Sequence, residues 1–319
     1  MKRVAVIGAA GFVGANLMRA LAAAGHEPIG VVAGQSSRWR LADTPYSLRE
    51  TSGDPASVVD ALDDLQPELV VNTAAHGAYP DQRSLERMCT TNIVLVDALA
   101  TWCTARRVAL LHLGSSSEYG VSDQPPGEAA TLRPNSTYAT TKAAGTHIVC
   151  DAVRRHGLVA TVFRLYSVYG RWEEPSRLMP TVAAHAAART LPPRLVSPHI
   201  ARDFVHIDDV ASAVLAWTDR PRPLGEPSIV NIGSGTQTTI GEVIELVRRI
   251  TATDEQPNWG SMEPRRWDTD RWQCDPSKAG EQLGWRAETP LDTGIRDLID
   301  FVAAHPDRYP APRPDPRLP

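Results

Sequence analysis

The chain has 319 residues, of which 42% are hydrophobic and 22% charged, as expected for an ordinary globular protein of one large domain or two fused ones. Its formal net charge of −4 argues against a nucleic-acid or membrane partner, because both favour a strongly basic face. No uninterrupted apolar run reaches the roughly 18–20 residues of a membrane span. The four cysteines lie far apart and match no metal-ligand spacing, so we expect a cytoplasmic protein with free thiols and no metal.

The first half of the chain alternates short apolar strands with helical patterns. Strands are expected at Val4–Ile7, Ile29–Ala33, Ser47–Thr51, Leu69–Asn72, Val108–Gly114 and Val159–Leu165. Helices are expected at Phe12–Ala24, Leu85–Thr104 and Thr137–Arg155. This alternation predicts an α/β fold, a Rossmann-type doubly wound parallel sheet covered by helices on both faces. Such a sheet binds its ligands beyond the carboxyl ends of its strands.

After about residue 170 the composition changes, with more proline and arginine and with shorter elements. Helices are expected at Met179–Arg189, Asp209–Thr218, Ile240–Ile250 and Leu291–Ala304, and strands at Asp203–His206 and Ser228–Ile232. The sequence therefore predicts a dinucleotide-binding domain over 1–168 and a smaller substrate-binding lobe over 169–308, partly interleaved with the sheet. Residues 309–319 contain five prolines and are expected to form an unpacked tail.

A glycine-rich loop follows the first strand and opens the first helix. Gly8, Gly11 and Gly14 are three residues apart. One glycine allows a tight turn, another lets the backbone approach a pyrophosphate, and the last allows close packing of helix and strand. The helix N-terminus adds unpaired N–H groups and the positive end of a dipole. We therefore expect a dinucleotide to contact Gly8, Gly11, Phe12, Val13 and Gly14.

The segment after the second strand bears on which dinucleotide is bound. NAD enzymes place a carboxylate there for the adenosine ribose, and this chain has none between Ile29 and Arg40. Ser36, Ser37 and Arg38, or Arg40, are suited instead to a 2′-phosphate. NADP is therefore favoured, with NAD as the alternative. Asp54, after the third strand, is suited either to the adenine or to capping the helix that begins near Pro55.

Tyr138 and Lys142 lie four residues apart in a predicted helix, which places them one above the other on the same face. A free phenol has a pKa near 10. A neighbouring ammonium together with an oxidised nicotinamide would lower the pKa of Tyr138 and make it a usable acid or base near neutral pH. The spacing alone is common, so the meaning of the pair depends on its surroundings.

Several separated segments occur together in one order along nearly the whole chain. They are Gly8–Gly14, Asn72–Ala75, Asn92, Gly114–Gly120, Tyr138–Lys142, Arg164–Gly170, Arg202–Val210 and Asp275–Trp285. In this they resemble the extended short-chain dehydrogenases/reductases of the NAD-dependent epimerase/dehydratase family, whose members modify nucleotide-sugars. The resemblance implies a nucleoside-diphosphate sugar as substrate. It also implies a homodimer formed through the helices predicted at 85–104 and 137–155.

The resemblance implies a role for each matching residue. Tyr138 donates or accepts the proton, Lys142 holds the nicotinamide ribose, and Ser116 matches the hydroxyl that binds the reacting sugar oxygen, with Ser115 and Ser117 as rivals in the serine run. The further cofactor contacts that it implies are Ala74, Ala75, Asn92, Tyr166 and Val168. The substrate contacts that it implies are Tyr79, Ser117, Glu118, Ser167, Arg177, Arg202 and Arg265, with Arg266 a near competitor of Arg265.

Three reactions share this set of residues. We expect reduction of an NDP-4-keto-6-deoxyhexose at C4 by NADPH, because the Glu118–Tyr119 register matches 4-keto-sugar reductases and the ribose carboxylate is missing. A 4-epimerase with bound NAD is the alternative, followed by a 4,6-dehydratase, of whose acid pair only Glu118 is present. A dinucleotide sensor without catalysis is the remaining class, and retention of Tyr138 and Lys142 argues against it.

Overall fold

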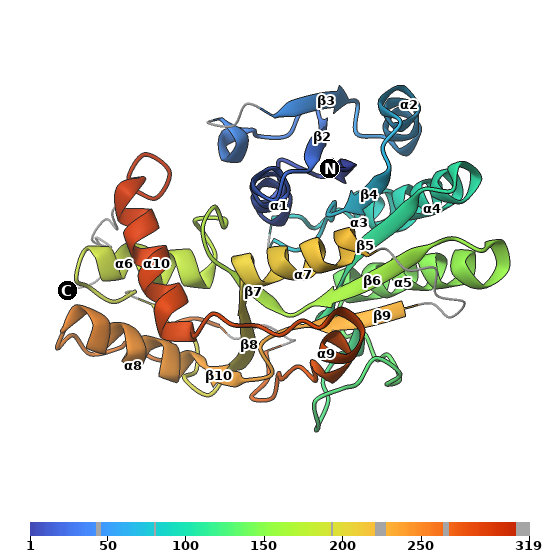
Figure 1. Cartoon of the computed structure of the whole chain (residues 1–319). Coiled ribbons are helices and arrows are strands. Elements are labelled where there is room, and N and C mark those ends of the chain that lie inside the picture. The colour runs from blue at the N-terminus through green and yellow to red at the C-terminus, as the bar shows by residue number, and fades with distance from the viewer. Residues whose placement is uncertain (43–45, 80, 193, 221–227, 264–267, 311–319) are drawn as a thin grey trace.

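The computed structural model describes residues 1–42, 46–79, 81–192, 194–220, 228–263 and 268–310 (Figure 1). Its main element is a seven-stranded sheet with the order β3-β2-β1-β4-β5-β6-β9, in which every neighbouring pair is parallel. The strands are β1 (Arg3–Ile7), β2 (Glu27–Ala33), β3 (Ser47–Thr51), β4 (Leu69–Asn72), β5 (Ala109–Ser115), β6 (Ala160–Leu165) and β9 (Ser228–Ile232). The predicted Rossmann-type α/β fold is confirmed.

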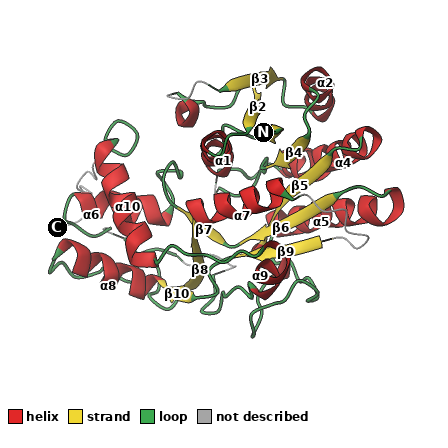
Figure 2. Cartoon of the chain, viewed as in Figure 1, coloured by secondary structure: helices red, strands yellow, loops and turns green. Residues whose placement is uncertain are grey.

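Helices cover both faces of this sheet, as Figure 2 shows. One face carries α1 (Phe12–Ala23) and α7 (Ile207–Asp219), and the other carries α2 (Pro55–Leu65), α4 (Leu95–Arg106) and α5 (Thr137–His156). The apolar side chains of α1 and α7 pack on Val4 and Val6 of β1, while those of α4 and α5 pack on Ala5 and Val70. Both faces of the strands are thus removed from water, which explains why the strands read as continuous apolar runs.

A short helix α3 (Leu85–Cys89) and a π-helical turn at Thr90–Val94 lead directly into α4. Taken together, Leu85–Arg106 passes a length and composition test for crossing a membrane. Leu95, Leu99 and Cys103 of this segment are buried in the core beneath the sheet. A core helix passes the same test, so this signal is weak evidence for a membrane span.

A second lobe forms around a three-stranded sheet with the order β10-β8-β7. Its elements are β7 (Ser167–Tyr169), β8 (Ala201–His206), β10 (Gln237–Thr239), α6 (Leu178–Ala187), α8 (Ile240–Thr251) and α10 (Leu291–Ala304). Their apolar side chains form a core of their own. Between these elements the chain returns to the large sheet with α7, β9 and α9 (Ser277–Leu283), so the two parts of the fold exchange segments along the sequence.

Four elements, short strands among them, are found with the predicted bounds: Ser47–Thr51, Leu69–Asn72, Ser228–Ile232 and Leu291–Ala304. The sequence did not indicate β7, β10 or α9, because these segments show neither an apolar run nor a clear period.

The start of the predicted tail is packed rather than free. Tyr309 is only 3% exposed, its hydroxyl donates to the Glu173 carbonyl at 2.7 Å, and its ring lies against Trp39 and Phe301. The prediction of an unpacked end is therefore wrong at Tyr309, because this aromatic ring fills the junction between the lobe and the loop after β2. The residues 311–319 lie outside the described part of the chain.

Asp203 of β8 joins three segments of the second lobe. Its buried carboxylate accepts hydrogen bonds from the backbone N–H groups of Ser234, Gly235 and Cys274, at 2.7, 2.9 and 2.9 Å. The Ser234 hydroxyl donates a fourth hydrogen bond at 2.8 Å. A single side chain thus satisfies the backbone of two loops that have no regular structure.

Asp203→Ala removes the acceptor for three backbone N–H groups, of which that of Cys274 is buried and those of Ser234 and Gly235 are half-buried. We expect the free energy of unfolding to fall by about 3–5 kcal/mol, as measured by urea denaturation. Asp219→Ala, at a carboxylate whose side chain is 67% exposed, is the matched control and should change stability by less than about 0.5 kcal/mol. Equal losses in the two variants would contradict this account of Asp203.

Candidate active site

The glycine loop forms a backbone cradle at the carboxyl end of β1. Gly8 has φ +82°, in the left-handed region, and a β-carbon there would lie 2.9 Å from the Ala74 Cα atom. A β-carbon at Gly14 would lie 2.4 Å from the Gly8 carbonyl oxygen. The α1 helix starts after Gly11 with no side-chain cap, so its first N–H groups face the loop. This arrangement fits the phosphates of a dinucleotide, and it brings Gly8, Gly14 and Ala74 together as predicted.

Asn92 stabilises the loop after β4, which lies next to this cradle. The Asn92 side chain is fully buried, accepts the His76 N–H at 2.9 Å, and donates to the His76 carbonyl and to the Thr141 hydroxyl. These bonds connect the loop after β4 to α5. A direct contact between Asn92 and the cofactor, as predicted, is therefore wrong: the amide has no exposed atom, and it acts through the loop that it holds.

The segment after β2 offers less for a 2′-phosphate than its sequence indicates. Arg38 forms an ion pair with Glu50 of β3, and both side chains are largely exposed. Arg40 is buried and donates to the Trp172 carbonyl and to Glu174 in the second lobe, at 2.7 and 2.9 Å. Ser37 is exposed beside Arg38, and Ser36 donates its backbone N–H to Ala33. Arg38 is thus the cation of this loop that remains near the surface.

Asp54 takes the simpler of its two predicted roles. Its carboxylate accepts the Ser57 N–H at 3.0 Å as the N-cap of α2, and its second oxygen is bonded to the Ser52 hydroxyl. These hydrogen bonds lower the pKa of Asp54 to about 2. The structure therefore gives Asp54 a helix-capping role, and since its carboxylate is exposed, the adenine contact stays a prediction.

The predicted catalytic groups meet where β5 ends beside the first turns of α5. Tyr138 and Lys142 lie on one face of α5, and the Ser115 side chain lies close enough to the Tyr138 phenol to lower its pKa by hydrogen bonding. Ser115 is therefore the serine beside Tyr138. Ser116, which we expected as the catalytic hydroxyl, begins the short helical turn after β5 and lines a pocket instead.

Burial controls the protonation of this pair. It raises the pKa of Tyr138 to about 12, against the lowering effects of the Ser115 hydrogen bond and of Arg177. It lowers the pKa of Lys142 to about 8, and the ammonium donates to the Leu113 carbonyl at 2.6 Å. The protein groups alone therefore do not lower the pKa of Tyr138, and the expected lowering, which we ascribed to the ammonium together with an oxidised nicotinamide, stays a prediction.

Glu118 is not available to a substrate. Its side chain has no exposed surface and forms an ion pair of 2.8 Å with Arg164, which is 2% exposed. The other carboxylate oxygen accepts the Ser115 N–H and the Thr146 hydroxyl. The predicted substrate contact of Glu118 is wrong, because the short helical turn Ser116–Tyr119 points this side chain into the core.

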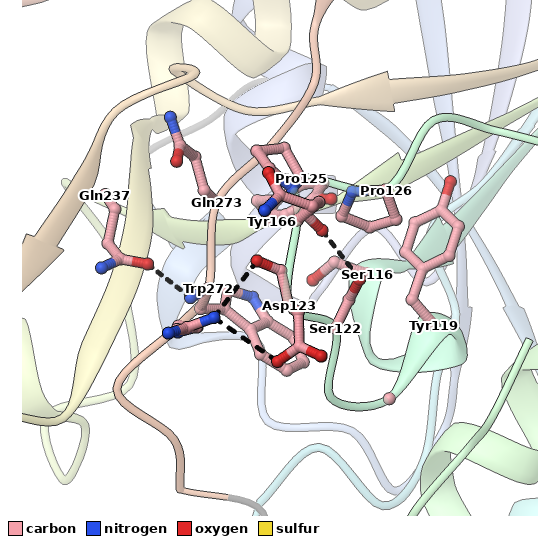
Figure 3. A pocket seen from close by; sticks show the side chains of 13 residues that line it. Ser116, Tyr119, Ser122, Asp123, Pro125, Pro126, Tyr166, Gln237, Trp272 and Gln273 are labelled. Carbon is pink, nitrogen blue, oxygen red and sulfur yellow. Dashed lines mark hydrogen bonds and ion pairs between the residues drawn. The ribbon is translucent and has the colours of Figure 1, made fainter. Parts of the chain in front are cut away.

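A polar pocket opens on the other side of the serine run (Figure 3). It has a volume of about 230 Å³. Its walls include Ser116, Tyr166, Gln237, Arg271 and Trp272. Tyr166, which we expected beside the nicotinamide, therefore faces this pocket. Val168, the other expected nicotinamide contact, packs against the core of the large sheet.

The predicted substrate arginines lie on the second lobe. Arg177 donates to the Ala78 carbonyl at 3.2 Å, and its guanidinium lies 5.8 Å from the ring of Tyr79. Arg202 donates to Asp268 at 2.6 Å and is 20% exposed. Arg265 and Arg266 lie outside the described residues. Ser167 is half-buried in β7, opposite Phe204 of β8.

A sequence model of the NAD dependent epimerase/dehydratase family matches residues 4–233. The chain belongs to this family. Members of the family are extended short-chain dehydrogenases/reductases that act on nucleotide-sugars, which confirms the resemblance stated from the motifs. Within the described residues no group of three His, Cys, Asp or Glu side chains could hold a metal ion.

Known proteins are similar to this chain over nearly its whole length. A dTDP-6-deoxy-L-talose 4-dehydrogenase (NAD(P)(+)) from Kitasatospora kifunensis is 31% identical over 93% of the chain and 94% of the relative. MoeE5, solved with UDP-glucuronic acid and NAD, is 28% identical with a TM-score of 0.81 over 95% and 99% of the two chains. The Thermus thermophilus UDP-glucose 4-epimerase, solved with NAD, is 27% identical with a TM-score of 0.79 over 94% and 98%.

Two features of the site escaped the sequence analysis. The polar pocket is lined by Gln237 and Trp272, which lie far from the serine run in sequence and carry no local signal. Thr146, which binds Glu118, is recognisable from the sequence, because it lies eight residues after Tyr138 and therefore on the same helix face.

Glu173 is a buried carboxyl at the junction beside Arg177 and Tyr309. It is 4% exposed, its Oε1 atom lies 3.6 Å from the Arg177 guanidinium, and its Oε2 atom has no hydrogen-bond partner. Burial raises the pKa of Glu173 to about 8, against the lowering effect of Arg177 and Arg40. The neutral form of Glu173 is therefore the favoured one up to this pH.

Glu173→Gln should remove a pH-dependent loss of stability. Between pH 4.5 and about 8 the folded protein holds a proton on Glu173 that the unfolded chain has released, so the free energy of unfolding falls as pH rises through this window. Thermal unfolding at several pH values should show the variant gaining stability over the wild type towards pH 8. Glu245→Gln, at a carboxylate that is 52% exposed, is the control. A constant difference between Glu173→Gln and the wild type would contradict the prediction.

Proposed function

We propose that this protein is a nucleotide-sugar C4 oxidoreductase, and that it reduces an NDP-4-keto-6-deoxyhexose at C4. The observation that carries the proposal is the placement of Ser115, Tyr138 and Lys142 together, at the sheet edge where the glycine loop also lies. These groups suit a carbonyl or alcohol carbon, because they supply a hydrogen-bond donor and a proton at one oxygen.

The residues divide the reduction between them. The reduced nicotinamide, when bound, supplies a hydride to the carbonyl carbon. Ser115 donates a hydrogen bond to the carbonyl oxygen, and Tyr138 gives that oxygen its proton, so that the C=O bond becomes a C–OH group. Lys142, whose ammonium is held by the Leu113 carbonyl, provides a positive charge that stabilises the phenolate left on Tyr138.

Relatives support reaction at C4 of a deoxysugar. The Kitasatospora relative is a 4-dehydrogenase of dTDP-6-deoxy-L-talose, whose reverse reaction is the reduction proposed here. Dehydration is disfavoured by the site itself. A 4,6-dehydratase needs an acid pair beside the catalytic hydroxyl, whereas Ser116 and Ser117 follow Ser115 and the Glu118 carboxylate is buried in an ion pair.

Epimerisation at C4 is the second candidate. A UDP-glucose 4-epimerase with NAD is among the solved structures of similar fold, and Glu50 neutralises the cation on which the preference for NADP depends. An epimerase retains its cofactor between turnovers. Identification of the dinucleotide released by denaturing the purified protein therefore separates the two: bound NAD supports the epimerase, and a protein that takes up NADPH from solution supports the reductase.

We further propose a homodimer in the cytoplasm. The outer surface of α3 and of the π-helical turn after it exposes Leu85 and Val94, at 58% and 51%, which a partner subunit would cover. All four cysteines are free thiols, as is usual in a reducing compartment. Sedimentation equilibrium tests the assembly.

Substitution of the two serines distinguishes their roles. Tyr138→Phe should lower kcat by about 10²–10⁴-fold, because the proton donor is lost. Ser115→Ala should lower it by about 10²-fold, whereas Ser116→Ala should act mainly on KM, because Ser116 faces the polar pocket. The assay is oxidation of NADPH by dTDP-4-keto-6-deoxyglucose, followed by absorbance. A larger loss of kcat in Ser116→Ala than in Ser115→Ala would contradict the assignment.

Arg38 and Glu50 should control the choice of dinucleotide. Arg38→Ala should weaken NADP binding about tenfold and leave NAD binding unchanged, because only NADP carries the 2′-phosphate. Glu50→Gln should strengthen NADP binding, because it frees Arg38 and removes a repelling carboxylate. Both affinities are measured by isothermal titration calorimetry. Arg49→Ala, on the same strand as Glu50 but paired with Asp64, is the control. Equal effects of Arg38→Ala on NAD and NADP would rule out a 2′-phosphate contact.

A further inference from the structure

The carboxylate of Glu118 connects two parts of the catalytic centre that are far apart in the sequence. Its Oε1 atom accepts the Ser115 N–H at 2.8 Å and the Thr146 hydroxyl at 3.0 Å. Ser115 belongs to the end of β5, and Thr146 belongs to α5. Its Oε2 atom accepts the Arg164 Nε–H at 2.8 Å. One buried oxygen atom is thus shared between the strand and the helix that carry the reacting groups.

We propose that Glu118 is a positioning residue, which acts through Ser115 and Thr146 to hold the Ser115 hydroxyl in register with Tyr138. This inference rests on the proposed function only in taking Ser115 and Tyr138 as the reacting groups. It assigns to Glu118 a role distinct from the acid of a dehydratase, since the carboxylate never reaches the substrate.

The spacing on α5 supports this role. Tyr138, Lys142 and Thr146 follow one another at intervals of four residues, so their side chains form one row along the helix. Each member of the row interacts with the end of β5 or with the turn after it. The partners are the Ser115 side chain, the Leu113 carbonyl and the Glu118 carboxylate, in that order. Glu118 therefore supplies the third of three connections and fixes the distance of the helix from the strand.

The orientation of Ser115 depends on the same carboxylate. While Glu118 accepts the Ser115 N–H, the Ser115 hydroxyl oxygen accepts the Ser117 N–H at 3.2 Å. These two bonds form a capping box around the turn Ser116–Tyr119. With its oxygen accepting the Ser117 N–H, Ser115 is left free to donate its hydrogen. The backbone also leaves room for Glu118, because a β-carbon at Gly114 would lie 2.7 Å from its Oε1 atom.

Arg164 keeps the carboxylate charged in the core. Its guanidinium also donates to the Glu128 carbonyl at 3.2 Å and lies 4.6 Å from the centre of the Tyr119 ring. Without such a partner a fully buried carboxyl would take up a proton and become a donor. A neutral acid would be a weaker acceptor than a carboxylate for the Ser115 N–H and the Thr146 hydroxyl. The ion pair therefore maintains the geometry of the connection.

The charge of Glu118 also acts on the reacting groups. It raises the pKa of Tyr138 and that of Lys142, while Arg177 lowers the pKa of Tyr138 from the second lobe. Tyr79 also faces Tyr138 and raises its pKa. On the strand side the neutral His112 faces Lys142. Removal of the Glu118 charge should therefore lower the pKa of Tyr138, a change that a purely structural role would not produce.

Variants of Thr146 test the connection with little risk to the fold. Thr146→Val keeps the shape of the side chain and removes the bond to Glu118, so we expect kcat to fall about tenfold with KM for the nucleotide-sugar unchanged. Thr146→Ser restores the hydroxyl and should restore kcat. Thr218→Val is the matched control, since Thr218 is a fully buried threonine of α7 whose hydroxyl bonds only the Val214 carbonyl. The control should leave kcat unchanged.

The charge is tested in a variant that keeps a hydrogen-bonded pair. Glu118→Gln combined with Arg164→Gln replaces the ion pair by two amides, which accept and donate between them without leaving a buried charge. The pH profile of kcat/KM for oxidation of the sugar alcohol reports the pKa of Tyr138. We expect its acidic limb to move to lower pH in the double variant, because the Glu118 charge that raises the pKa of Tyr138 is absent.

Crystal structures of Thr146→Val and the wild type give a readout that needs no turnover. We expect a longer distance between the Ser115 and Tyr138 hydroxyls in the variant. An unchanged distance, an unchanged kcat in Thr146→Val, or an unshifted pH profile in the double variant would overturn the inference. If Tyr138→Phe retains full activity, or the wild type reduces no 4-keto nucleotide-sugar, the proposed function itself fails, and the distance still decides the role of Glu118.

Discussion

The site depends on one constraint, the common direction of all seven strands in the large sheet. Because every pair is parallel, the carboxyl ends of β1, β4 and β5 lie at one edge. The glycine loop leaves β1, the loop braced by Asn92 leaves β4, and the serine run leaves β5 at this same edge. Helix α5 then passes below β5 and presents Tyr138 and Lys142 to it. A parallel sheet thus assembles chemistry from segments that are separated by more than a hundred residues.

Buried charges hold the loops of this edge in place. Asp203 accepts hydrogen bonds from the backbone of two loops in the second lobe, and Glu118 accepts them from a strand end and a helix. Each replaces the regular hydrogen bonding that a loop lacks. A carboxylate suits this purpose because it accepts several hydrogen bonds at once, and in the Glu118 case an arginine makes its burial tolerable. Glu173 has no such compensation for one of its oxygens, and its raised pKa reflects this.

The family determines the kind of chemistry, and a few side chains decide which reaction takes place. The glycine cradle and the pair of Tyr138 and Lys142 suit every reaction that passes a hydride to or from C4. The choice between them depends on what stands beside this centre. Here a buried Glu118 removes an acid that dehydration would use, and Glu50 moderates the cation that would select NADP. These two ion pairs therefore bear on which of the three reactions takes place.

The sequence by itself determined the α/β fold, most strands of the sheet, the glycine loop and the placement of Tyr138 and Lys142 on one helix face. These are local signals, because each is carried by the period of an apolar run or by residues within one turn of a helix. Only the tertiary structure decided that Ser115 rather than Ser116 faces Tyr138, that Glu118 points into the core, and that Arg40 and Tyr309 join the two lobes. The direction of a side chain at a strand end, and the partner of a buried charge, depend on neighbours that the chain brings near only when it folds.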